Sequence, residues 1–62
     1  MEGTKQKELY FLFMDELGEY FVVMDYSKEH AIETAKNWFD TRVRFQHMVD
    51  EDYSERYGLD VY

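Results

Sequence analysis

Two short stretches near the start of the chain are apolar at consecutive positions, not only at alternate ones. The first spans residues 8–14 (ELYFLFM) and the second spans residues 19–25 (EYFVVMD). Both are rich in aromatic and β-branched side chains and too short for a helix, which predicts strands. Because the first stretch is apolar on both of its faces, we expect it to be the central strand of a sheet.

The segment between these two stretches has the composition of a tight turn. Residues 15–18 are Asp, Glu, Leu and Gly. Glycine adopts a positive φ at little steric cost, so Gly18 is placed to end a hairpin loop. The two strands are therefore predicted to pair as an antiparallel hairpin.

Residues 28–39 predict an amphipathic helix. Ser27 is a suitable N-cap, because its hydroxyl can accept a hydrogen bond from backbone N–H groups of the first helical turn. Apolar residues then recur at the spacing of one helical face; they are Ala31, Ile32, Ala35, Trp38 and Phe39. We expect Trp38 and Phe39 to close this apolar stripe, with Phe39 against a phenylalanine of the central strand.

The last third of the chain begins with an alternating segment. Residues 42–49 (RVRFQHMV) predict a half-exposed strand. The face with the larger apolar side chains would carry Val43, Phe45, His47 and Val49. Residues 50–58 predict a short acidic helix that begins at Asp50 and ends at Gly58. Residues 59–62 are expected to pack back as a short extended piece.

The resulting order of elements is β-β-α-β followed by a short helix, which is an α+β fold. A helical crossover returns the chain parallel to the strand that it left. The simplest arrangement is a three-stranded antiparallel sheet in the order 2-1-3, with one packed helix and a short acidic C-terminal helix. Residues 1–62 form a single small domain, and residues 1–7 are expected to be a flexible N-terminal arm.

The chain has many apolar side chains for a domain whose core must be small. The 62 residues include six Tyr, five Phe and one Trp but no Cys and no Pro. A domain of this size buries only about 60% of the surface that its unfolded chain exposes. Without disulfides, such domains commonly gain stability from self-association or from a partner. We therefore expect part of the second sheet face to stay open.

The open face would carry side chains from both strands of the hairpin, or those on the alternate face. Its candidate residues are Tyr10, Leu12, Met14, Tyr20, Val22 and Met24. Tyr and Met are enriched in the cores of protein interfaces. This face could bind a partner or form a homodimer. The alternative is that the tail helix covers these side chains and that they belong to the core.

Charge indicates what kind of partner the protein attracts. Fourteen acidic residues stand against seven Lys and Arg, for a net charge of −7. This charge opposes direct binding of nucleic acid or of an anionic membrane, and it attracts basic protein surfaces. Two acidic clusters are candidates for such binding: Asp50, Glu51, Asp52 and Glu55 in the tail, and Asp15, Glu16 and Glu19 around the hairpin.

These carboxylates could imitate the phosphates of a nucleic-acid strand and occupy the basic groove of a protein that binds one. A solvated acidic surface that keeps the protein soluble is the alternative. In both cases the acidic residues would act without a bound cofactor.

The sequence contains no motif that is typical of a catalytic or metal-binding site. His30 and His47 have no third ligand at a suitable spacing, and the chain has no HExxH motif. Ser27 and Ser54 have no general base that the spacing reveals. We therefore expect no enzymatic activity, no cofactor and no metal. The polar start of the chain and its short apolar stretches lead us to expect a cytoplasmic protein without a membrane span.

Two segments resemble those of small phage and mobile-element proteins. They are residues 20–39 (YFVVMDYSKEHAIETAKNWF) and residues 50–62 (DEDYSERYGLDVY). Several groups of small acidic phage proteins inhibit host nucleic-acid machinery, including anti-restriction proteins, anti-CRISPR proteins and uracil-glycosylase inhibitors. The order of elements is also similar to the HicB-type antitoxin fold, although the proline-containing loop after its second strand is missing here. The resemblance implies a phage-encoded inhibitor of a basic, nucleic-acid-binding host protein.

Overall fold

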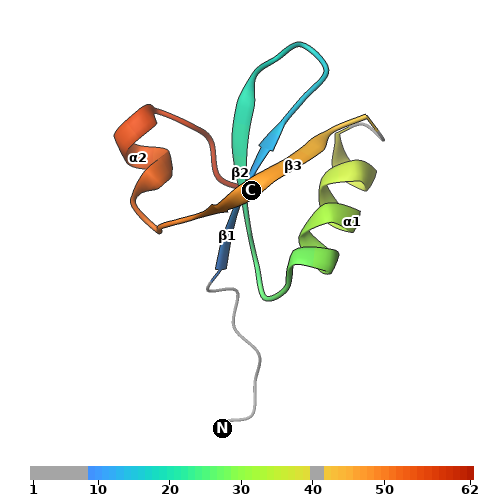
Figure 1. Cartoon of the computed structure of the whole chain (residues 1–62), viewed down its shortest axis with the longest axis horizontal. Coiled ribbons are helices and arrows are strands. Elements are labelled where there is room, and N and C mark those ends of the chain that lie inside the picture. Colours follow the sequence, from blue (N-terminus) through green and yellow to red (C-terminus); the bar gives the residue numbers. More distant parts are fainter. Residues whose placement is uncertain (1–8, 40–41) are drawn as a thin grey trace, which may run out of the picture.

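The computed structural model of the chain describes residues 9–39 and 42–62. It contains three strands, β1 (Leu9–Met14), β2 (Tyr20–Asp25) and β3 (Arg44–Val49), and two helices, α1 (Lys28–Trp38) and α2 (Tyr53–Tyr57). The expected flexible arm at residues 1–7 lies outside the described residues. The order of elements along the chain is the predicted one (Figure 1).

The sheet has the predicted topology. Its strand order is β2-β1-β3, and β1 pairs with both neighbours in an antiparallel orientation. The central position of β1 follows from its composition, because Phe11, Leu12 and Phe13 are all buried. Gly18 ends the β1–β2 turn with a φ of 84°, the left-handed conformation that glycine adopts most readily.

The main core lies between the sheet and α1. Its buried residues are Phe11, Phe13, Phe21, Val23, Ala31, Ala35 and Val43, and the partly buried Ile32 and Phe45 pack against them. The Oγ of Ser27 accepts a hydrogen bond from the backbone N–H of His30 at 3.1 Å, which confirms the predicted cap. Because Ala31 and Ala35 are small, the helix can lie directly on the aromatic rings of the strands.

At the end of α1 the structure differs from the expected apolar stripe, because Trp38 and Phe39 are not buried. Trp38 is 72% exposed and Phe39 is 41% exposed. The ring of Phe39 packs against Phe21 at 4.5 Å and against Tyr62 at 4.7 Å, and not against the phenylalanines of β1. The physical reason is the position of the helix, which lies closest to β2. The last turn of α1 therefore packs near the edge strand β2, and the indole of Trp38 stays in solvent.

In β3 the side chains do not alternate between the two sheet faces as expected. Leu12 pairs with His47, but the next residue, Phe13, pairs with Phe45, so the register shifts and Gln46 is an extra residue. Such a β-bulge reverses which face the following side chains occupy. Phe45 therefore joins the core beside Phe13, at 5.7 Å between ring centroids, while His47 lies on the other face with Leu12.

The second face of the sheet is partly covered by the end of the chain. In Figure 1, α1 and α2 lie on opposite sides of the sheet. The ring centroids of Tyr53 in α2 and His47 in β3 lie 6.4 Å apart. Gly58 ends α2 in the left-handed conformation, as predicted, with a φ of 68°. The helix is shorter than expected, because it begins after Asp52 and not after Asp50.

Residues 60–62 then pair with the outer edge of β2 in a parallel bridge between Val22 and Val61. The backbone N–H of Val22 donates to the carbonyl of Asp60 at 2.9 Å, and the N–H of Met24 donates to the carbonyl of Tyr62 at 2.9 Å. The N–H of Tyr62 donates in turn to the carbonyl of Val22 at 2.8 Å. The chain therefore closes the β2 edge with its own last residues.

Candidate functional site

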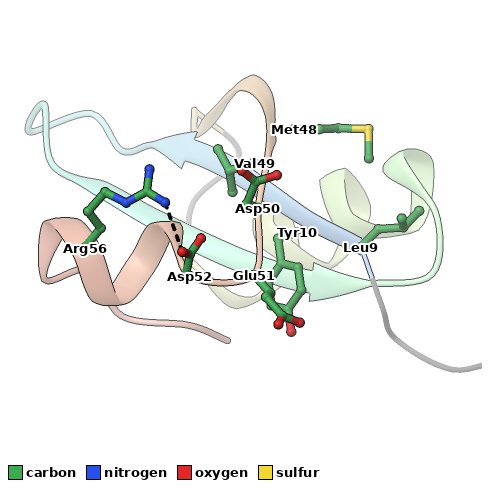
Figure 2. Close-up of a pocket in the computed structure, with 8 residues that line it drawn as sticks. All are labelled: Leu9, Tyr10, Met48, Val49, Asp50, Glu51, Asp52 and Arg56. Carbon is green, nitrogen blue, oxygen red and sulfur yellow. Dashed lines mark hydrogen bonds and ion pairs between the residues drawn. The ribbon is translucent and has the colours of Figure 1, made fainter.

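A hollow at one end of the sheet brings together residues from three elements. We call it the acidic pocket, and Figure 2 shows the residues that line it. They come from the start of β1, the end of β3, the segment leading into α2 and α2 itself, and they are Leu9, Tyr10, Met48, Val49, Asp50, Glu51, Asp52 and Arg56. Three of the four predicted tail acids therefore line one hollow, while Glu55, also exposed, does not.

The strands place the apolar part of this pocket. Tyr10 and Val49 are cross-strand partners in β1 and β3. Leu9 is 39% exposed and Met48 is 52% exposed, so the lining of the pocket includes apolar surface that reaches solvent. After Val49 the chain turns, and the N–H of Tyr53 donates to the carbonyl of Asp50 at 3.1 Å. This turn holds the acidic residues next to the strand ends.

The carboxylates of the pocket differ in their partners. Asp52 Oδ2 forms an ion pair with Arg56 Nη2 at 2.9 Å, one helical turn further along the chain. The hydrogen bond and the negative charge of Asp52 raise the pKa of the Arg56 guanidinium above its ordinary value. Within residues 9–39 and 42–62, no Lys or Arg lies within ion-pair distance of Asp50 or Glu51. Both of these carboxylates are exposed.

The second predicted acidic cluster lies at the other end of β1, in the hairpin, where its residues have different roles. Asp15 Oδ1 accepts hydrogen bonds from the N–H groups of Leu17 and Glu19, both at 2.9 Å, so this carboxylate builds the turn. Glu16 forms an ion pair with Arg42 at 2.7 Å. Glu19 is exposed. The structure therefore keeps the two acidic clusters apart.

The predicted open face is exposed only in part. Leu12 and Val22 are 4% and 0% exposed, so the chain itself buries the middle of this face. Tyr10, Met14 and Met24 are half-buried. Among the six candidate residues, Tyr20 alone is exposed, at 48%. The alternative interpretation, in which these side chains belong to the core, holds for Leu12 and Val22.

A buried carboxylate that sequence reasoning missed lies at the start of α1. Asp25 is 1% exposed, and its Oδ1 accepts a hydrogen bond from the N–H of Tyr26 at 2.7 Å. Its Oδ2 lies 2.7 Å from Nδ1 of His30, whose ring stacks on that of Tyr26. The sequence signal was an acid at the end of a strand, two residues before the N-cap. The contact fixes the ring of a half-exposed histidine.

The described residues contain neither a cluster of metal-binding side chains nor a helix suited to a membrane. Nowhere in the described part of the chain do three His, Cys, Asp or Glu side chains gather around a common point where a metal ion could bind. Neither of the two described helices has the length and apolar character that crossing a bilayer requires. Comparisons of the chain with protein-family models, with curated proteins and with solved structures find no match.

Proposed function

We propose that this protein is a non-enzymatic acidic module that binds a basic surface of a partner protein. The observation that carries the proposal is the acidic pocket, whose lining includes Asp50 and Glu51 together with the exposed side chains of Leu9 and Met48. A Lys or Arg side chain has the matching construction, with an aliphatic stem that packs on apolar surface and a cationic head. Charge-assisted hydrogen bonds would hold the head at the carboxylates.

The partner that this chemistry favours is a nucleic-acid-binding protein. Such proteins present clustered Lys and Arg to phosphates, and carboxylates on a small rigid domain can occupy the same groove. The net charge of −7 would raise the rate of encounter with a basic surface. Occupying the groove would inhibit the partner. A phage-encoded inhibitor of a host protein is the biological role consistent with this chemistry.

A pair of charge variants tests the proposal. The site variant combines Asp50→Lys with Glu51→Lys and leaves the Asp52–Arg56 ion pair in place. The control variant combines Glu29→Lys with Glu33→Lys on the exposed side of α1, so both variants undergo the same change in net charge. Each is immobilised and exposed to nuclease-treated host lysate, and bound protein is eluted with salt or with duplex DNA.

The wild type and the control variant should retain a basic protein that both salt and DNA elute, since screening and competition remove the same contacts. The site variant should lose this protein. If the site variant retains it as well as the control does, or if DNA fails to elute it, the acidic pocket is not a nucleic-acid mimic.

A homodimer formed through the sheet face is the alternative function. The burial of Leu12 and Val22 removes two of its six contact residues. For that reason we propose binding of a basic partner as the function, and not self-association through this face.

A further inference from the structure

A second hollow lies at the hairpin end of the sheet, away from the acidic pocket. We call it the hairpin-end groove; it is lined by Asp15, Glu16, Leu17, Trp38 and Phe39. Figure 1 shows the tip of the β1–β2 hairpin and the last turn of α1 at the same end of the molecule. We propose that this groove is a docking site for a basic segment of a partner protein in which an apolar side chain is flanked by Lys or Arg.

The first reason is the exposure of large apolar side chains. Leu17 is 81% exposed, Trp38 is 72% exposed and Phe39 is 41% exposed. Contiguous apolar surface of this kind is unusual on a protein without a partner. Tryptophan is also among the residues that contribute most to binding energy in protein interfaces. The groove therefore has the composition of an interface core.

The second reason is that the turn holds Leu17 rigidly in solvent. Asp15 Oδ1 accepts from the N–H groups of Leu17 and Glu19, as described above. The N–H of Asp15 donates to the carbonyl of Glu19 at 2.9 Å, and the N–H of Gly18 donates to the carbonyl of Asp15 at 3.1 Å. A loop ordered before binding loses little entropy when a ligand arrives. The turn thus presents Leu17 in a preorganised position.

The other wall of the groove is also supported. Phe39 packs on Phe21 and Tyr62, with centroid distances of 4.5 and 4.7 Å. These contacts anchor one aromatic ring, and Trp38 precedes it at the end of α1 with most of its indole in solvent. The groove therefore lies between a fixed turn and an anchored helix end.

The acidic residues of the hairpin-end groove indicate which ligand it binds. The two charged residues that line the groove, Asp15 and Glu16, are both acidic. Glu16 already pairs with Arg42. A Lys or Arg next to the docked apolar side chain would therefore join that ion pair, and it could also interact with the carboxylate of Asp15 and with the face of the indole. A second copy of this chain is a poorer match, because each copy carries a net charge of −7 and the same acidic groove.

The only tryptophan of the chain lies in the groove, so its fluorescence reports on occupancy directly. The probes are three synthetic peptides of equal length, with alternating Arg and Leu, alternating Arg and Ser, and alternating Glu and Leu. The Arg–Leu peptide should move the emission of Trp38 to shorter wavelength and protect it from acrylamide quenching. The other two should bind at least about tenfold more weakly, because each lacks one of the two recognised features.

Two variants make the test specific. Leu17→Ser removes an apolar wall but keeps the reporter, and it should weaken binding of the Arg–Leu peptide by about fivefold or more. Tyr57→Ser is the matched control, because Tyr57 is 60% exposed on α2 and does not line the groove. This control should bind as wild type does. Circular dichroism of both variants verifies that they are folded.

Three results would overturn the proposal. In the first, the Arg–Leu peptide at about 1 mM, the limit of weak specific binding, leaves the emission and quenching of Trp38 unchanged. In the second, Leu17→Ser binds as tightly as Tyr57→Ser. In the third, the emission shifts with protein concentration in the absence of any peptide, which would show that a second copy occupies the groove.

Discussion

The carboxylate of Asp25, buried at the end of β2, lies 2.7 Å from Nδ1 of His30 in the first turn of α1. The same carboxylate accepts the N–H of Tyr26, and the ring of Tyr26 stacks on that of His30 at 4.8 Å between centroids. One buried side chain thus connects the last residue of a strand to the start of the helix. This contact holds the first turn of α1 against the end of β2.

Replacing His30 with alanine should destabilise the fold by about 1–3 kcal/mol, because the buried Asp25 would lose a hydrogen-bond partner. Urea unfolding followed by circular dichroism measures this change. His47→Ala is the control, since His47 is exposed and contacts its neighbour's carbonyl and a tyrosine ring. Equal losses in the two variants would mean that the contact with Asp25 contributes nothing special.

Two phenylalanines should differ in what their removal costs. Phe13 is 0% exposed and packs on Phe21 and Phe45, so Phe13→Ala should cost about 3–5 kcal/mol and leave so small a domain largely unfolded. Phe39 is 41% exposed, so Phe39→Ala should cost clearly less and leave a folded protein. Thermal melts of both variants provide the comparison. If Phe39→Ala unfolds the protein as completely, α1 must lie differently on the sheet.

Truncation after Leu59 should weaken the edge of β2. It removes the carbonyls that accept the N–H groups of Val22 and Met24, and we expect a loss of about 1–3 kcal/mol. Hydrogen exchange measured by NMR should show faster exchange of these two amides in particular. Tyr62→Ala separates the contribution of the backbone from that of the ring, because it keeps the carbonyl that Met24 uses. Unchanged protection of Val22 after truncation would contradict the parallel bridge.

Tyr62 should ionise above its ordinary pKa. Partial burial of the phenol raises its pKa, and the negative charge of Asp60 and the hydrogen bond to its carboxylate, at 3.4 Å, raise it further. Asp60→Asn should therefore lower the pKa of Tyr62, which NMR of the labelled ring measures. Because the folded state holds this proton more tightly than the unfolded state does, stability should fall as the pH rises from the ordinary pKa of tyrosine through the raised pKa of Tyr62. A pKa that does not respond to Asp60→Asn would exclude this coupling.

Much of the fold could be predicted because local and global preferences agree. The two apolar faces of β1 indicated a central strand, and Ser27, Gly18 and Gly58 marked element ends through general backbone rules. The strand order then followed from connectivity. These signals are local in the sequence, so a single chain suffices to detect them.

The errors arose where a distant segment determines the outcome. The bulge at Gln46 leaves the alternating pattern of β3 intact and becomes visible only through its pairing with β1. Trp38 has the spacing of a core residue, but the helix lies toward β2 and leaves the indole in solvent. Asp25 looked like one more surface acid until the fold brought His30 to its carboxylate.

The candidate sites were predicted in part for a similar reason. Asp50, Glu51 and Asp52 are neighbours in the chain, so their clustering needed no fold to be recognised. The apolar side chains beside them, Leu9 and Met48, come from two strands that only the sheet brings together. The hairpin-end groove likewise joins a turn to the end of a helix, and no spacing along the sequence reveals it.

The two borders of the sheet have a consequence for how this protein behaves at high concentration. An exposed strand border is a template on which further chains can add and form fibres. Here residues 60–62 pair with the edge strand β2. The edge strand on the other side, β3, is interrupted by the bulge at Gln46. Such interruptions hinder regular stacking of strands. Both features should therefore oppose edge-to-edge association of a chain with this many aromatic side chains.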